Sequence, residues 1–509
     1  MTKLDSENPT KDNDSVHVNT ESVVQTPDVI APSPSYFPFT PGSTHTKPQQ
    51  RPPLEYHASE IELGMLDHIP VDFHQVPSHT DLEDGTKDHS DSHLLTFTRR
   101  KHVMALCASC LWAFCQGFAD GAPGALLPYM EEYYHIGYSL VSLIWICNAS
   151  GVISFAPIAH RILLKLGFRY SLVAACCCSV VMHSIVCTGT KFPVICLAYF
   201  IGGVGLSVAG SQLNIFVSRY EKASLALGYF HGCYGLGASV SPLIATVFVS
   251  KGYKWHTFYF VLLGLSAFAA INAFIHFSEA DQDMKAIEEH NEVKEEQPKS
   301  ILVQALKSKT TWLLGFFVLF YQGSEVSVGA WVVTYIRDYR GNHDTSVGYV
   351  ASGYWFGLTF GRLVMTPTCH HYLGARVGNS LLICLSLILV GMTWAIPSTL
   401  GEGICVSLAG ICIGPIYPLM ITVVSGVVPR KIQVVSLVFA SAFGYSGGAL
   451  FPFLIGLISQ FKGAFVMLPA FLAMFTATLV IWLCLPKLPN SKGLTSTVRK
   501  HLGLHRFFA

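Results

Sequence analysis

The sequence reads QGFADGAPGALLPY over Gln116–Tyr129, and this stretch places one carboxylate, Asp120, in a run of about 25 residues that holds no other charge. A second stretch, Gln322–Tyr335, reads QGSEVSVGAWVVTY and repeats the opening Gln-Gly, an acid, the pair Gly-Ala and the closing tyrosine. When the Gly-Ala pairs are aligned, Asp120 falls opposite Glu325, 205 residues later. An acid in such apolar surroundings is costly, and it usually faces a cavity and has a function.

The composition indicates a membrane protein. Of 509 residues, 51% are hydrophobic and 13% charged, and the mean hydropathy is +0.43. A soluble domain carries about 25% charged residues. The charges here are concentrated in 1–101 and 278–310. The remainder forms apolar blocks of about 20 residues, the length that spans a bilayer as a helix, so we expect an all-α membrane protein.

Twelve apolar blocks have this length and predict twelve transmembrane helices. They cover approximately 103–129, 139–160, 170–190, 193–217, 223–249, 255–277, 312–336, 346–367, 377–396, 400–427, 433–459 and 463–485.

Lysine and arginine in the short loops indicate the orientation, because cytoplasmic loops are enriched in them. Basic residues precede the first block and follow the second, fourth and tenth, whereas most alternate loops carry fewer. We therefore expect both termini in the cytosol. The predicted parts are a disordered cytosolic tail, a six-helix half, a cytosolic central loop, a second six-helix half and a basic cytosolic tail, at 1–101, 102–277, 278–310, 311–485 and 486–509.

The two halves repeat each other. LGFR begins at Leu166 and LGAR begins at Leu373, 207 residues later. The fifth block contains GASVSP, which ends at Pro242, and the eleventh contains the similar GGALFP, which ends at Pro452. The matches keep their order, with an offset that drifts slowly. Parallel repeats of six helices characterise one class of secondary transporter, whose halves move around a central site.

Other classes of function find no support in the sequence. The 15 cysteines include no CxxC pair with a matching histidine pair, so a zinc site is not expected, and we expect no metal and no cofactor besides a proton gradient. No phosphate-binding GxxxxGK[ST] motif is present, and no GxSxG pattern or metal cluster points to chemistry, so we expect neither ATP hydrolysis nor an enzyme, and assign no catalytic residue. The expected partners are the lipid bilayer, protons and a small-molecule substrate, with no nucleic acid, and we expect a monomer.

At this point the chain resembles the major facilitator superfamily (MFS). HRILLKLGFR, at His160–Arg169, is similar to a degenerate form of the cytoplasmic signature between the second and third helices of that family. FGR, at Phe360–Arg362, is similar to the same signature in the second half. The resemblance implies a twelve-helix fold and a gating loop. Its residues here would be His160, Arg161, Gly167, Arg169 and Arg362.

A narrower resemblance is to the fucose/glucose permease-like branch and its fungal relatives. It rests on GFADGAPGALLPYMEEYY, HGCYGLGASVSP, EVSVGAWVVTY and GPIYPLM. That branch includes proton-coupled sugar carriers with a buried acid in the first helix, and Asp120 matches this position. The branch also uses a glutamate in its fourth helix, where this chain has Gly210, with Gln212 close by. The resemblance also implies the plasma membrane.

The candidate site follows from the acids and from this resemblance. Asp120 and Glu325 are predicted to couple protons or bind substrate, the alternative being a structural role. Helices one, four, seven and ten line the cavity in the family, which makes amides and a tyrosine there candidate contacts. Each such residue, taken alone, more often forms a hydrogen bond between helices. His231 is a further candidate, and a neutral histidine bonded between helices is its alternative. The candidates are Gln116, Gln212, Asn214, His231, Gln322 and Tyr417.

Three functions remain open from the sequence. The first is a proton-coupled secondary transporter of a small organic solute, such as a sugar, that works by alternating access. The second is an efflux pump that exports a metabolite or a drug-like compound. The third is a receptor or sensor on the same fold that transports nothing.

Overall fold

The computed structural model describes residues 95–284 and 298–486. The chain divides into two units, Met1–Glu55 and Tyr56–Ala509, and all described residues belong to the second. Most of the two predicted tails and most of the charged part of the central loop therefore lie outside the described residues, whereas 95–101 of the predicted N-terminal tail are described.

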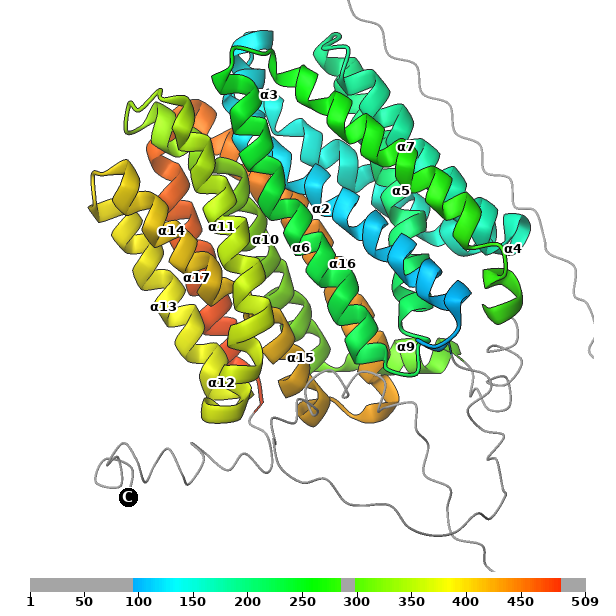
Figure 1. The fold of residues 1–509 in the computed structure, drawn as a ribbon. Coiled ribbons are helices and arrows are strands. Elements are labelled where there is room, and N and C mark those ends of the chain that lie inside the picture. The colour runs from blue at the N-terminus through cyan, green and yellow to red at the C-terminus, as the bar shows by residue number, and fades with distance from the viewer. Residues whose placement is uncertain (1–94, 285–297, 487–509) are drawn as a thin grey trace, which may run out of the picture. The chain divides into compact units, whose positions relative to one another are not determined.

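The described part is almost entirely helical (Figure 1). The first half contains α2 (Arg100–Tyr134), α3 (Tyr138–Val141), α4 (Leu143–Val186), α5 (Phe192–Val217), α6 (Ala223–Ser250), η2 (Trp255–Phe258) and α7 (Tyr259–His276). The second half contains α9 (Pro298–Lys307), α10 (Lys309–Asp338), η3 (Thr345–Gly348), α11 (Tyr349–Phe360), η4 (Gly361–Met365), α12 (Thr366–Leu373), α13 (Ala375–Ala395), α14 (Thr399–Ile413), α15 (Ile416–Val427), α16 (Arg430–Lys462), η5 (Ala464–Val466) and α17 (Met467–Cys484).

Eleven segments of the described residues are long and apolar enough to cross a membrane. They match eleven of the twelve predicted blocks. The block at 346–367 is also helical, but it consists of η3, α11, the π-helical turn η4 and α12 in succession. The block at 400–427 is divided after Gly414, where Pro415 precedes α15, because proline supplies no amide for the helix. The all-α, twelve-helix membrane fold expected from the sequence is confirmed.

The stretch between the second and third blocks differs from the expected loop. Two helical stretches of α4 meet there at Gly167, where the backbone is not helical and φ is +76°. This left-handed conformation suits glycine. The amide of the next residue, Phe168, donates a hydrogen bond to the carboxylate of Asp281, which follows α7. An acid from far along the chain thus holds the bend in α4.

Glycines let α2 approach its neighbours closely. A Cβ on Gly117 would lie 1.9 Å from the carbonyl oxygen of Tyr234 on α6, and one on Gly124 would lie 2.0 Å from that of Gly329 on α10. Small residues at such contacts allow backbones to touch in membrane helices. Although Pro123 and Pro128 lie within it, α2 remains one helix. Asp120 is therefore held on a helix wedged between elements of both halves.

We name the two ends of the bundle after α2, the Arg100 end and the Tyr134 end. The halves join at the Tyr134 end, where the hydroxyl of Tyr138 donates to Asp338 over 2.7 Å. The ring of Trp331 on α10 packs against Tyr138, with centroids 5.9 Å apart. Next to them, a Cβ on Gly137 would lie 1.9 Å from Oε1 of Gln460 on α16. These contacts join the two halves at the Tyr134 end.

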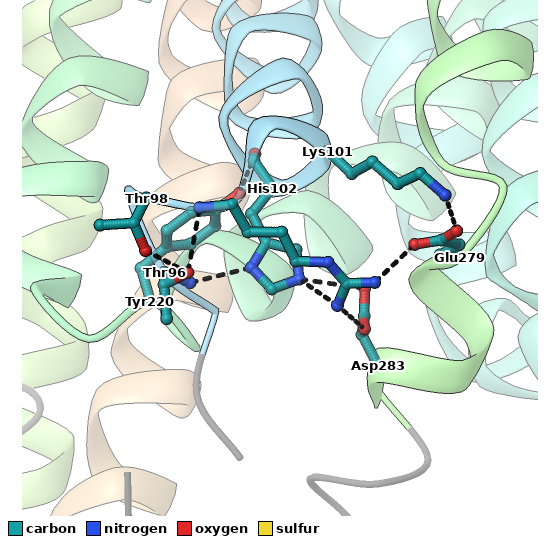
Figure 2. Close-up of polar contacts among 8 residues, drawn as sticks. Thr96, Thr98, Lys101, His102, Tyr220, Glu279 and Asp283 are labelled. Atoms are coloured by element: carbon teal, nitrogen blue, oxygen red, sulfur yellow. Dashed lines mark hydrogen bonds and ion pairs between the residues drawn. The ribbon is translucent and has the colours of Figure 1, made fainter. Parts of the chain in front are cut away.

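At the Arg100 end, polar contacts tie the start of α2 to elements of the first half (Figure 2). The amide of Leu95 donates to the carbonyl of Arg219, and Leu95 in turn accepts from the amide of Glu221. The side chains that follow form ion pairs with the segment after α7. Arg99 and Lys101 both contact Glu279, and His102 and Arg99 lie 3.5 Å from Asp283.

Candidate functional site

Asp120 is solvent-exposed although it lies near the middle of a membrane-spanning helix. Its carboxylate accepts a hydrogen bond of 3.0 Å from Nε2 of Gln116, one turn earlier on α2. It accepts a second, of 2.9 Å, from the hydroxyl of Tyr234 on α6. Both donors are neutral, and within the described ranges Asp120 forms no ion pair. An exposed carboxylate held by neutral donors can lose and regain a proton without breaking an ion pair.

Glu325 occupies the equivalent place on α10, but its surroundings differ. Its side chain is 9% exposed, and Oε1 accepts from Nη2 of Arg362 over 2.6 Å. The hydroxyl of Tyr321 donates to Oε2. The hydroxyl of Tyr354 on α11 donates to the backbone carbonyl of Glu325 over 2.8 Å. Glu325 is therefore a buried, ion-paired carboxylate that joins α10 to the helix carrying Arg362.

The two acids keep one feature of the sequence repeat. Each carries a hydrogen-bond donor four residues earlier on its own helix, Gln116 for Asp120 and Tyr321 for Glu325. Residues at this spacing face the same side of a helix. The repeat thus includes the acids and the hydrogen-bond donors that precede them. The halves differ because Glu325 also pairs with a cation, Arg362.

Arg362 lies in η4, where the helix widens to a π-helical turn. Such turns occur often at functional sites, because they turn a side chain away from the regular helical face. The guanidinium of Arg362 reaches Glu325, while 30% of its side chain remains exposed. The sequence assigned Arg362 to the gating loop, and the structure places it in the centre of the site.

The remaining candidates are distributed between two environments. Gln322 on α10 packs against Gly444 of α16, and the hydroxyl of Tyr417 lies 3.1 Å from Oγ of Ser441. The ring of Tyr417 also stacks on that of Tyr321, with centroids 6.3 Å apart. These two candidates therefore belong to the surroundings of Glu325.

The candidates on α5 have other partners. Gln212 is 4% exposed, and its Oε1 accepts from the hydroxyl of Ser171 on α4 over 2.9 Å. Asn214 is exposed, and its amide donates to the carbonyl of Gly210 on its own helix over 2.8 Å. His231 on α6 is also exposed, and it interacts electrostatically with Arg362. Of the three, His231 lies near Arg362, the cation that pairs with Glu325.

The predicted gating-loop residues do not form one cluster. The side chain of His160 lies outside the described residues. Arg161 is exposed, and Gly167 bends α4 beside Asp281. The guanidinium of Arg169 lies over the ring of Phe274, 4.0 Å from its centroid. Gly167 and Arg169 thus contact their own half.

Sequence reasoning missed four tyrosines at the site. Tyr234 and Tyr321 donate hydrogen bonds to the two acids, and Tyr354 donates to the backbone carbonyl of Glu325. Tyr445 on α16 lies near Asp120 and Tyr417. The four-residue spacing from each acid would have identified Tyr321. No local signal marks Tyr234 or Tyr445, because both reach the site from other helices.

The model of the Major Facilitator Superfamily matches residues 109–452. Bypass of stop codon protein 6 of Saccharomyces cerevisiae is 27% identical over 376 residues, which cover 68% of this chain and 75% of that protein. The multidrug efflux protein YfmO of Bacillus subtilis is 25% identical over 368 residues, 71% of this chain and 87% of that protein. A glucose/galactose transporter of Brucella abortus is 21% identical over 291 residues, 53% and 68% of the two chains.

Among solved structures, a point mutant of the nucleoside transporter NupG superimposes with a TM-score of 0.61. The sequences are 11% identical, and the match covers 75% of this chain and all of NupG. At this identity the likeness concerns the fold.

Proposed function

This chain belongs to the Major Facilitator Superfamily, and we propose that it carries a small polar organic solute across the membrane together with a proton, by alternating access. A sugar-like solute fits the amide and hydroxyl groups near the acids, because they form directional hydrogen bonds with polyhydroxy ligands. The resemblance to a glucose/galactose transporter points the same way.

The observation that carries the proposal is the contrast between Asp120 and Glu325. Glu325 is balanced by Arg362, whereas the described partners of Asp120 are the neutral groups of Gln116 and Tyr234. A charge in a membrane-spanning site is costly unless it is paired or hydrated. Taking up a proton neutralises Asp120 and leaves the Glu325–Arg362 pair intact. Asp120 is therefore the proposed proton carrier, and Glu325 the fixed partner of Arg362.

The contacts between the halves support alternating access. Tyr138, Gln460 and Trp331 join the halves at the Tyr134 end. Asp120 is nevertheless exposed. This combination fits a carrier state closed at the Tyr134 end, with its acid reached from the other side. The repeat provides the second state, since two similar halves can rock about a central site.

Export of a drug-like compound is the second candidate. The chain is 25% identical to a multidrug efflux protein. The stacked rings of Tyr321 and Tyr417 beside the site offer an aromatic surface that suits such a compound. In uptake the solute moves in the same direction as the proton, whereas in export it moves in the opposite direction.

The test is transport in liposomes that contain the purified chain, with an imposed pH gradient and a panel of labelled sugars and drug-like compounds. We expect the gradient to drive accumulation of one class, and Asp120→Asn to abolish accumulation while sparing exchange. Glu132→Gln, which removes an exposed acid on the same helix, is the matched control and should behave like the parent. Accumulation by Asp120→Asn at the parent level would refute proton coupling through this residue. If no member of the panel moves, the receptor hypothesis gains support.

A further inference from the structure

Helices α6 and α11 belong to different halves and pack against each other in antiparallel orientation at the boundary between the halves. A Cβ on Gly348, just before α11, would lie 2.2 Å from Oγ1 of Thr246, and one on Gly235 would lie 2.5 Å from Oγ1 of Thr359. Residue numbers thus rise along one helix as they fall along the other. One turn beyond the second contact, toward the Arg100 end, the register brings His231 opposite Arg362.

The charge of Arg362 acts on His231, in agreement with this register. Tyr234, next to Gly235 on α6, also lies within electrostatic reach of Arg362 and Glu325. The guanidinium therefore contacts Glu325 on α10 and lies near His231 and Tyr234 on α6.

Part of the Arg362 guanidinium is available to a ligand. Its described polar contacts, with Glu325 and Tyr321, are both to α10. A guanidinium has five N–H donors in a planar fork, and Glu325 takes a single bond from Nη2. The side chain is 30% exposed, and His231 beside it is exposed as well. Donors from both halves, the guanidinium of Arg362 and the imidazole of His231, are thus exposed and lie near each other.

We propose that Arg362 and His231 bind the carboxylate of the substrate, so that the solute is a sugar-acid-like monoanion. This inference rests on the proposed function and specifies its substrate class. A guanidinium fork matches the two oxygens of a carboxylate, and an imidazole adds one N–H donor in its neutral form. The hydroxyl groups of the solute then reach the amide of Gln116 and the tyrosines.

Charge conservation gives this inference a distinctive consequence. The Glu325–Arg362 pair has no net charge. In the loaded state, Asp120 is protonated and the bound monoanion gives the site one negative charge. In the empty state, the ionised Asp120 gives the site the same single negative charge. One full cycle then moves one proton and one anion, which is electroneutral. With a neutral sugar, the same cycle moves one positive charge.

The test uses D-glucuronate and D-glucose, which differ by a carboxylate in place of a hydroxymethyl group, in liposomes containing the full chain. We expect a pH gradient to drive glucuronate uptake, and a potassium–valinomycin potential to leave its rate unchanged. Preference for glucose over glucuronate would overturn the inference and leave the proposed function standing. Glucuronate uptake that follows the membrane potential would overturn it too. If neither solute moves, the inference fails, and the wider panel of labelled solutes decides the proposed function separately.

Variants separate binding from folding. His231→Gln should raise the KM for glucuronate about tenfold, as expected for one lost charge-assisted hydrogen bond, and should change glucose handling less. His371→Gln, at an exposed histidine of α12, is the matched control. Because Arg362→Gln alone leaves Glu325 unpaired, the double variant Arg362→Gln/Glu325→Gln is used, and its ratio of glucuronate to glucose uptake should fall at least tenfold. An unchanged ratio in both the His231 variant and the double variant would contradict the inference.

Discussion

Nη2 of Arg362 donates to Oε1 of Glu325 over 2.6 Å, and this ion pair distinguishes two acids that the sequence repeat makes equivalent. Glu325 is held by a cation and two tyrosines, whereas Asp120 is held by an amide and one tyrosine. Replacing the acid by its amide should therefore have different consequences at the two positions. It should affect folding at Glu325 and proton coupling at Asp120.

Glu325→Gln should destabilise the fold more than Asp120→Asn. Removing one partner of a buried charge pair costs about 2–5 kcal/mol, mostly because the other charge stays buried and unpaired. Since Arg362 is 30% exposed, water can compensate part of the loss, and we expect a value near the lower end. Thermal unfolding of the detergent-purified variants measures the difference.

The double variant Glu325→Gln/Arg362→Gln should recover part of that loss, because no unpaired charge remains. The ion pair does not have the structural role assigned to it if Glu325→Gln unfolds at the parent temperature. The same follows if the loss of unfolding free energy in the double variant equals the sum of the losses in the two single variants.

The sequence predicted the helices well, and its limits lie in contacts between helices. Apolar length alone located the twelve blocks, because each must cross the same thickness of bilayer. Asp120 and Glu325 were found because an acid stands out in an apolar run. The partner of Glu325, however, lies on the next membrane-crossing segment, where a π-helical turn redirects Arg362. Linear spacing does not reveal that turn, nor the capping of the α4 bend by Asp281.

Gly124→Ala should weaken the contact between α2 and α10. The added Cβ would lie 2.0 Å from the carbonyl oxygen of Gly329, and backbone atoms at such a contact can only move apart. Overpacking of this kind costs about 1–3 kcal/mol. Thermal unfolding should show the loss, whereas Gly264→Ala on α7, where an added Cβ meets nothing within 4 Å, should leave stability near the parent value. Equal stability of the two variants would contradict this close packing.

The ion pairs at the Arg100 end predict a pH dependence of stability. The hydrogen bond from Lys101 lowers the pKa of Glu279 below its usual value. A lowered pKa in the folded state stabilises the fold above the unfolded-state pKa, about 4.3, and the contribution disappears as the pH falls through the folded-state pKa. Glu279→Gln should therefore unfold at a lower temperature than the parent at pH 7, and the gap should narrow on acidification below about pH 4.3.

The same gap should shrink in a Lys101→Met background and at about 1 M salt, because exposed charges are screened. A gap that stays constant from pH 7 to acid would show that Glu279 acts through packing instead of charge.

The contacts at the Tyr134 end predict that this end must open during transport. Gly137 and Gln460 come from different halves and meet there. A Gly137→Cys/Gln460→Cys variant treated with a short, reducible thiol cross-linker should join the halves and stop solute exchange in liposomes, and reduction should restore it. Each single-cysteine variant, treated in the same way, controls for the 15 native cysteines. Since alternating access requires the two halves to separate at each end in turn, undiminished exchange by the fully cross-linked protein would contradict both this gate and the proposed transport cycle.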